Sequence, residues 1–313
     1  MSTPTTSTFH RTLIAAAAAL AGLGASGGAS AVSIVGVVGQ DTLVSFDSTN
    51  PTFVTATLTV TGLGGELIRG IDFRPSNGVL YAIGGSGTLF TINTATGAAT
   101  IAGSIPVTSS DLDFGFAFNP VPDAIRTVTS TDKNLRSPLV GPTAGTTITD
   151  TALAYAAGDR NFGVNPNVTG AAYTNQVAGT VTATTLYVID AATSSLVLQN
   201  PPNNGTLTTI GSLGVSLFSN GFGVGFDIDG TSNLAFASLV TSLGGNGLYG
   251  IDLATGAATL LGGFGNNTVR DIAVGSFAVT PVPEPETYAL FVAGLAGLAA
   301  VQRRRTRKAR AAA

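Results

Sequence analysis

Asp227, Asp229 and Asn233 are the residues whose spacing most resembles a metal-binding loop. They occur in the stretch FDIDGTSN, in which Gly230 follows the second carboxylate. Alternating carboxylate and amide oxygens around a turn glycine are a common way to bind Ca²⁺. The acidic residue that normally closes such a loop is missing here, and Asp-Gly is also a frequent hairpin turn. The stretch therefore predicts either a Ca²⁺ site or an ordinary turn.

Histidine and cysteine are nearly absent from this chain. His10 is the only histidine, and there is no cysteine. Without these side chains the chain beyond residue 31 cannot build a Ser-His-Asp triad, a cysteine protease site, a histidine-based zinc or copper site, or an iron–sulfur cluster. Carboxylate, lysine or tyrosine chemistry and oxygen-ligated metals are what remains. We expect no cofactor other than a Ca²⁺ ion.

Two pairs of charged residues begin similar stretches of the chain. Arg69 and Asp72 belong to RGIDF, and Arg270 and Asp271 belong to VRDIAV. If the strands that carry them surround an axis, these side chains either face a ligand or form salt bridges and turn hydrogen bonds between repeats. The carboxylates of the DLDF stretch, residues 111–114, could combine with Asp72 as a general acid/base pair, a role that depends on the distance between the carboxyl groups. Both interpretations stay open.

Lys133 and Arg136, with Asn134 between them, form the one cluster of positive charge in residues 32–281. These side chains either bind a sugar acid or solvate their loop and cap the neighbouring Asp132. The segment as a whole is acidic, with seven Lys and Arg against fifteen Asp and Glu. Nucleic-acid binding requires Lys and Arg that neutralise phosphates, so we expect no nucleic-acid partner.

A hairpin motif recurs four times along the chain. GTLFTINTATGAATIAG at residues 87–103 returns as NGLYGIDLATGAATLLGG at 246–263, with weaker copies at 185–199 and 41–58. Each strong copy has alternating β-forming residues, a turn with Asn or Asp and Thr-Gly, and a second strand. Another strand–turn–strand motif precedes the hairpins. Each repeat therefore predicts a four-stranded antiparallel unit.

The units recur at the interval of propeller blades. Spacings of 46, 55, 53 and 47 residues separate the matched positions Ile71, Ala117, Ala172, Gly225 and Ile272. Four-stranded blades recur at about 40 to 50 residues, whereas a parallel β-helix would repeat at about half that interval or less. The last motif, at 269–277, has no hairpin after it, and the first hairpin has only a short strand before it. We expect the C-terminal strand to complete the N-terminal blade.

The sequence thus predicts an all-β, β-propeller-like fold. It has about five four-stranded antiparallel blades, a ring closed by the C-terminal strand, and short hydrophobic helices at both termini. Four or six blades stay open, as does a β-sandwich, which the irregular repeats and the QNPPNNGTL stretch at 199–207 favour.

The order of short motifs resembles the bacterial domain of unknown function 4394, an exported propeller-like domain. RGIDF, RP, NGVLYAIG, NLR, TGAAYTN, LYVID, PPNNGTL, VGFDI, LYGIDL and RDIAV carry the resemblance, which covers most of residues 41–278. The resemblance implies a fold and no activity, and it transfers no catalytic residue.

The N-terminal residues 1–31 have the pattern of a secretory signal peptide. His10 and Arg11 form a modest positive region before an apolar core at residues 13–23. Small residues follow at Ala29 and Ala31, the −3 and −1 positions of a cleavage site. We predict cleavage after Ala31, with the alternative of a helix that belongs to the fold.

The C-terminal residues 280–313 have a different composition from the propeller-like domain at 32–279. TPVPEP carries three prolines, which end a sheet and form a stiff spacer. A transmembrane segment is predicted at 287–301, short for a bilayer of about 30 Å. The basic tail 302–313 contains six cations, which hold this end on the cytoplasmic side: Arg303, Arg304, Arg305, Arg307, Lys308 and Arg310.

This tail resembles the PEP-CTERM sorting signal of Gram-negative bacteria. Val282, Pro283, Glu284 and Pro285 form the motif, followed by the apolar run and the basic cluster. The resemblance implies a transient inner-membrane anchor, an exosortase-type membrane enzyme as partner, cleavage near the motif, and delivery to the cell surface or extracellular matrix in organisms that make exopolysaccharide. A permanent tail anchor is the alternative.

From these observations we expect an exported, non-enzymatic interaction or structural module at the cell surface. Its other partners would be exopolysaccharide or surface proteins. Two alternatives belong to other classes: a polysaccharide hydrolase or lyase that uses carboxylates, and a module that binds Ca²⁺ or sugar.

Overall fold

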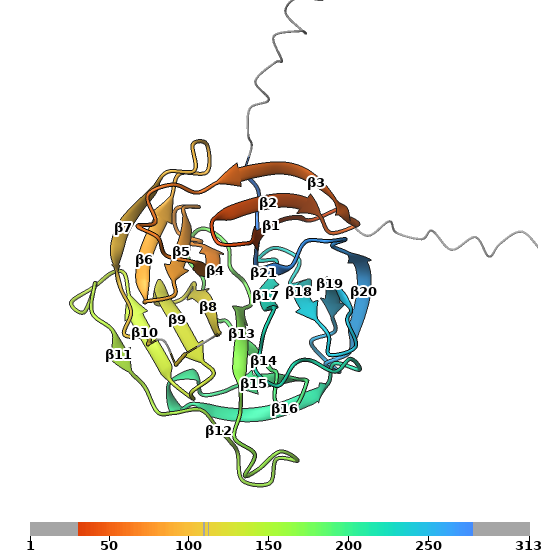
Figure 1. Cartoon of the computed structure of the whole chain (residues 1–313). Coiled ribbons are helices and arrows are strands. Elements are labelled where there is room, and N and C mark those ends of the chain that lie inside the picture. Colours follow the sequence, from red (N-terminus) through yellow and green to blue (C-terminus); the bar gives the residue numbers. More distant parts are fainter. Residues whose placement is uncertain (1–30, 109, 112, 278–313) are drawn as a thin grey trace, which may run out of the picture. The chain divides into compact units, whose positions relative to one another are not determined.

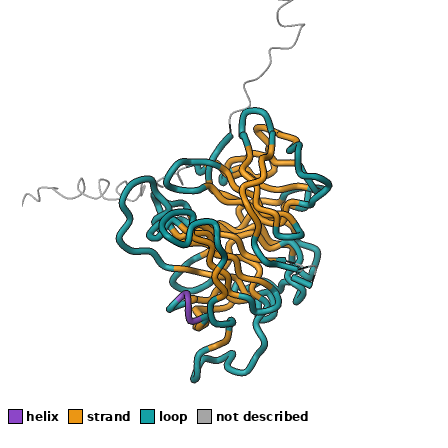
Figure 2. Tube along the Cα trace, turned by 90° about the vertical axis from the view of Figure 1, so that its left-hand side faces the viewer, coloured by secondary structure: helices purple, strands orange, loops and turns teal. Residues whose placement is uncertain are grey.

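The structure is a computed structural model, and it describes residues 31–108, 110–111 and 113–277. Five β-sheets surround a common axis (Figure 1). Strands fill the interior of this body and loops lie at its surface (Figure 2). The fold is a five-bladed β-propeller, so the β-sandwich alternative is wrong.

The strands follow the chain from blade to blade. The first sheet has the order β21 (Val269–Val274), β1 (Ser33–Val38), β2 (Thr42–Asp47) and β3 (Asn50–Thr59). The second contains β4 (Ile68–Phe73), β5 (Leu80–Gly84), β6 (Thr88–Ile92) and β7 (Ala99–Ser104). The third contains β8 (Phe114–Asn119), β9 (Ala124–Thr129), β10 (Asn134–Pro138) and β11 (Ile148–Thr149).

The fourth sheet departs from four strands. It has the order β13 (Val168–Tyr173), β14 (Leu186–Asp190), β15 (Ser195–Gln199), β16 (Thr206–Ser212) and the short β12 (Ala154–Tyr155), which pairs parallel with β16. The fifth sheet contains β17 (Val224–Ile228), β18 (Ala235–Val240), β19 (Asn246–Ile251) and β20 (Ala258–Gly263).

The predicted terminal helices fall outside the described residues, as does the predicted membrane segment 287–301. Within the part of the chain that the structure describes, the helical element is the 3-10 turn η1 (Pro202–Asn204). No helix in that part is long and apolar enough to cross a membrane.

Five hydrophobic clusters hold the blades together, one between each pair of neighbouring sheets. Phe90 and Val35 belong to the cluster shared by the first two blades, and Phe46 and Phe236 to the one shared by the fifth and first. The other clusters join the second and third, third and fourth, and fourth and fifth blades. Because the central strands are covered on both faces, β5, β9, β13 and β17 are buried along their whole length.

Glycines allow the innermost strands to pack closely around the axis. A Cβ atom at Gly70 would lie 2.8 Å from Phe116 Cβ, and one at Gly115 would lie 2.6 Å from Ala171 Cβ. The next two glycines pack as closely. A Cβ atom at Gly170 would lie 2.9 Å from Phe226 Cβ, and one at Gly225 would lie 2.5 Å from Asp271 Cα. These distances leave no room for a side chain.

This packing corrects the alignment of the repeats. The positions matched along the sequence align Gly225 with Ile71, whereas the packing makes Gly225 equivalent to Gly70, one residue earlier in the chain. Glycine contacts between neighbouring inner strands set the register, and a scheme that matches apolar residues does not detect them.

Candidate functional site

Three buried aspartates lie on the innermost strands. Asp72, Asp227 and Asp271 belong to β4, β17 and β21 and are at most 8% exposed. Each carboxylate accepts a hydrogen bond from a backbone N–H of the next inner strand.

These hydrogen bonds join neighbouring blades in sequence. Phe118 N donates to Asp72 at 2.7 Å, Val274 N to Asp227 at 2.6 Å, and Ile71 N to Asp271 at 2.8 Å. Asp72 and Asp271 therefore form hydrogen bonds between repeats, which is one of the two predicted alternatives. The carboxylates stabilise three of the seams between blades.

Burial makes these three carboxylates hard to ionise. It raises the pKa of Asp227 to about 7, against the backbone N–H groups that lower it. Burial, with the nearby Asp227, also raises the pKa of Asp72 and of Asp271 well above the usual range. Each of these groups therefore loses its proton at a higher pH than an exposed aspartate does.

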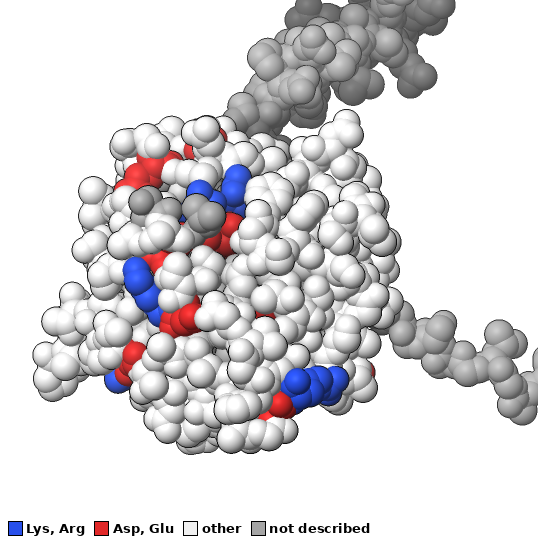
Figure 3. Space-filling view, turned by 60° about the horizontal axis from the view of Figure 1, so that its bottom comes forward, with Lys and Arg blue, Asp and Glu red and all other residues white. Residues whose placement is uncertain are grey.

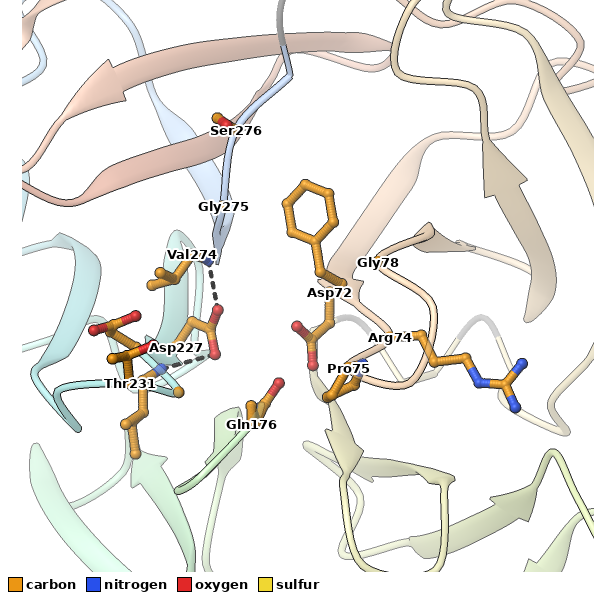
Figure 4. A pocket seen from close by; sticks show the side chains of 14 residues that line it. Asp72, Arg74, Pro75, Gly78, Gln176, Asp227, Thr231, Val274, Gly275 and Ser276 are labelled. Atoms are coloured by element: carbon orange, nitrogen blue, oxygen red, sulfur yellow. Dashed lines mark hydrogen bonds between the residues drawn. The ribbon is translucent and has the colours of Figure 1, made fainter. Parts of the chain in front are cut away.

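Asp72 and Asp227 line one cavity at the end of the axis where the inner strands finish. Its volume is about 310 Å³. Figure 4 shows the two carboxyl groups facing each other across this space, with the Gln176 side chain beside them. Two carboxyl groups of raised pKa and an amide can exchange hydrogen bonds and protons with a polar ligand.

The three residues of the predicted Ca²⁺ loop have different hydrogen-bond partners, although Asp227 and Asp229 line the same cavity. Asp227 is buried and accepts hydrogen bonds from backbone amides, whereas the half-buried Asp229 accepts a 2.9 Å hydrogen bond from Ser232 N. The Asn233 side chain pairs with Asn175 of the neighbouring blade at 2.9 and 3.0 Å. Among the described residues, no group of three or more His, Cys, Asp or Glu side chains could hold a metal ion.

A second charged group lies at the opposite end of the axis, where the inner strands begin. Arg69 Nη1 donates to Asp113 Oδ1 at 3.4 Å. Burial raises the pKa of Asp113 to about 6, although Arg69 and Arg270 both oppose this shift. The Arg270 guanidinium lies 5.8 Å from the centre of the Phe222 ring. Figure 3 shows how sparse charge is on one face of the body: blue and red side chains form small groups among uncharged atoms.

The predicted acid/base pair of the DLDF stretch is not brought together with Asp72. Asp111 bonds to Lys133 Nζ at 2.6 Å and to Thr108. Asp113 belongs to the end of the axis where Arg69 lies. These carboxylates therefore have different partners from Asp72.

The predicted basic cluster is engaged in the third blade. Lys133 bonds to Asp111, and Arg136 Nη2 donates to Asp150 Oδ1 at 3.0 Å. Asn134 is fully buried and donates to the carbonyl of Pro202 at 2.8 Å. These contacts give the cluster a structural role.

Arg126 was missed by the sequence reasoning. It is 2% exposed, and its guanidinium donates to Asn134 Oδ1 at 2.7 Å, Asp150 Oδ2 at 2.8 Å and Asn203 Oδ1 at 2.6 Å. The network joins β9 and β10 to η1 of the fourth blade. One signal for it exists in the sequence: a lone arginine inside the β-forming run AIRTVT.

The raised pKa of Asp227 predicts a dependence of stability on pH. Between the pKa of an unfolded aspartate, about 4, and the folded value of about 7, the folded state binds more protons than the unfolded chain. The free energy of unfolding contributed by this group is thus highest below about pH 4 and falls as pH rises to about 7. Asp227→Asn should make this fall shallower, by up to about 1.4 kcal/mol per pH unit.

Urea denaturation at a series of pH values from 4 to 7 measures this effect. Asp252→Asn is the matched control, because hydrogen bonds to Thr255 and Ala254 lower the pKa of this exposed carboxylate, so its effect lies at more acidic pH. Parallel curves for Asp227→Asn and the wild type would show that the carboxyl group does not titrate in this range.

Several predicted sites fall outside the described residues. They are Ala29 of the signal cleavage site, residues 282–285 of the sorting motif, and the basic residues of the tail. Ala31 is the first residue that the structure describes, and its position does not test the predicted cleavage.

Comparison with known proteins identifies two segments of the chain. Residues 42–273 match the family model described as a domain of unknown function, DUF4394. Residues 281–305 match the model of the PEP-CTERM protein-sorting motif. No curated protein matches the chain.

Three solved structures are similar to parts of the chain at low sequence identity. A structural genomics protein of unknown function from Bacteroides thetaiotaomicron is 16% identical, with a TM-score of 0.48 over 78% of this chain and 64% of the other. A chain of a nidogen/laminin complex is 12% identical, with a TM-score of 0.44 over 79% of this chain and 98% of the other. TolB from Acinetobacter baumannii is 13% identical, with a TM-score of 0.43 over 73% of this chain and 52% of the other. This chain spans less than two thirds of the first of these structures.

Proposed function

We propose that this chain, which belongs to the DUF4394 family, is a β-propeller module that acts at the cell surface or in the extracellular matrix. The PEP-CTERM motif at residues 281–305 carries the proposal, because this motif implies an exported protein that an exosortase-type membrane enzyme sorts. The propeller is then the domain that is delivered, and the C-terminal tail is its sorting signal.

The two ends of the chain support a route for this cargo. A signal peptide cleaved after Ala31 would start export. The apolar segment 287–301 and the cations of residues 302–313 would hold the protein transiently in the inner membrane. Cleavage near residues 282–285 would then release the propeller.

We propose an interaction module associated with exopolysaccharide in preference to an enzyme. The support is that the buried carboxylates on the inner strands are bonded to backbone N–H groups of neighbouring blades. A carboxylate-based hydrolase or lyase stands as the second candidate, because Asp72 and Asp227 share a cavity and have raised pKa values. If the wild type cleaves the host polysaccharide and Asp72→Asn does not, the result would favour the enzyme.

We also infer that β21 closes the ring of blades. β21 pairs with β1 in the register Ile34↔Val274, and it packs against both β17 and β4. The hydrophobic cluster between the fifth and first blades contains residues of β21 as well. A crystal structure with β21 detached from β1 would contradict closure.

The sorting motif predicts an all-or-none effect of a single substitution. Glu284→Ala in the full chain should block processing in a Gram-negative host that carries an exosortase, so the protein should stay in the membrane fraction. Glu286→Ala, two residues away and outside the four-residue core at 282–285, is the matched control and should be processed normally.

Fractionation and western blotting read the outcome, and a host without the exosortase should retain even the wild type. Equal release of Glu284→Ala and Glu286→Ala would remove the support that the motif gives to this function.

A further inference from the structure

Arg270 occupies a position that is glycine on the four other inner strands. Gly70, Gly115, Gly170 and Gly225 each precede a residue that packs against a neighbouring inner strand, and Arg270 precedes Asp271 in the same way. Of these five equivalent positions on the inner strands, the one on β21 therefore carries a side chain beyond hydrogen. It lies beside Arg69, which is the second residue of β4.

Within residues 31–277 as the structure describes them, one carboxylate lies near both guanidinium groups. Asp113 is the carboxylate that interacts with both of them, so the group has two positive charges and at most one negative charge. Burial, and then the charge of Arg69, lowers the pKa of Arg270. Within the described part of the chain, Nε of Arg270 is buried and has no hydrogen-bond partner. Another anion beside the two guanidinium groups would neutralise the excess charge.

Phe222 gives this group an apolar wall. Its ring lies 5.8 Å from the Arg270 guanidinium, and the residue is 38% exposed. Phe222 precedes β17, so the wall comes from a different blade than either arginine. A ligand with an apolar ring face beside its anionic group can contact both features.

We propose that Arg69 and Arg270 bind the carboxylate of an acidic sugar, with the sugar ring against Phe222. The planar fork of a guanidinium matches the two oxygens of a carboxylate, which favours arginine over lysine for this task. One carboxylate brings the charge of the group to zero. The proposal rests on the proposed surface function only for the source of the ligand, an acidic polysaccharide outside the cell.

Calorimetric titration of the full chain, purified in mild detergent, tests this site. The probes are D-glucuronate, D-glucose, which has a similar ring without the carboxylate, and inorganic sulfate. We expect binding of glucuronate and none of glucose. Arg270→Gln should weaken glucuronate binding at least about tenfold, since it removes a charge-assisted hydrogen bond. The control Arg160→Gln, at an exposed arginine bonded to the carbonyl of Ile210, should bind as the wild type does.

Asp113→Asn provides a result that loss of folding cannot imitate. It removes the carboxylate that competes for the arginines, so glucuronate should bind several-fold more tightly than to the wild type. Unchanged binding by Arg270→Gln, weaker binding by a folded Asp113→Asn, equal binding of glucose, or binding of sulfate without glucuronate would each overturn the proposal. Sorting is read from processing of the tail, so failure of this site leaves the proposed function standing.

Discussion

Gly115→Ala should destabilise the propeller by about 3 kcal/mol, although it adds only one methyl group. The new Cβ would lie 2.6 Å from both Cβ and N of Ala171 and 2.8 Å from the carbonyl carbon of Gly170. Backbone atoms cannot move aside as a flexible side chain can, so β8 and β13 would have to separate. For a domain of this size the loss corresponds to a fall in Tm of roughly 6 to 12 °C.

Gly250→Ala is the matched control for this substitution. Gly250 also lies inside a strand, β19, but its nearest neighbours are Leu261 side-chain atoms at 3.7 Å or more, and its φ is not positive. We expect a change within about 0.5 kcal/mol. Chemical denaturation of both variants and the wild type measures the difference. Equal stability of the two variants would contradict close packing of the inner strands.

Arg126→Met should cost about 3 kcal/mol, at the lower end of the range for breaking a buried ion pair. The substitution removes the donors to Asn134, Asp150 and Asn203, all in the network between the third and fourth blades. Asp150 keeps its second partner, because Arg136 donates to it at 3.0 and 3.1 Å. This second partner is why we expect the lower end of the range.

Arg136→Met isolates the effect of burial, since both arginines bind the same carboxylate. The side chain of Arg136 is 29% exposed, whereas that of Arg126 is 2% exposed. Water screens the more exposed pair, so we expect a loss of about 1 kcal/mol or less. Urea denaturation of the two variants provides the comparison. A larger loss for Arg136→Met would mean that the network stabilises the protein through its exposed members.

The blades could be predicted from the sequence because each turn carries its own signal. Thr-Gly turns at Gly97 and Gly256, with positive φ values of 76° and 81°, repeat inside similar hairpins. Turn chemistry and strand alternation are local properties, so they can be read along the chain. The extra strand β12 has two residues, too few for an alternating pattern.

The roles of the charged residues could not be predicted in the same way. Asp72 bonds to Phe118, 46 residues away, and Asp271 to Ile71, 200 residues away. Arg126 reaches Asn203, 77 residues away. Such partners are set by which strands become neighbours around the axis. A carboxylate that joins two blades and one that faces a ligand have the same appearance in the sequence.

The charged group at the start of the inner strands shows the same limit. Arg69 and Arg270 were identified as candidates for the axis, but their meeting with Asp113 depends on the contacts of β21 with β4 and of β4 with β8. The average charge of the body is negative and gave no indication of this locally positive place. Local charge, set by three strands, decides what can bind there.

The central claim is that the propeller is cargo of a sorting system, and the intact mass of the released protein tests it most directly. The full chain should be expressed in an exosortase-bearing Gram-negative host and collected outside the cells. The account predicts a form that begins at Val32 and lacks the apolar run and the basic tail. A released form that still ends in Ala313 would contradict it.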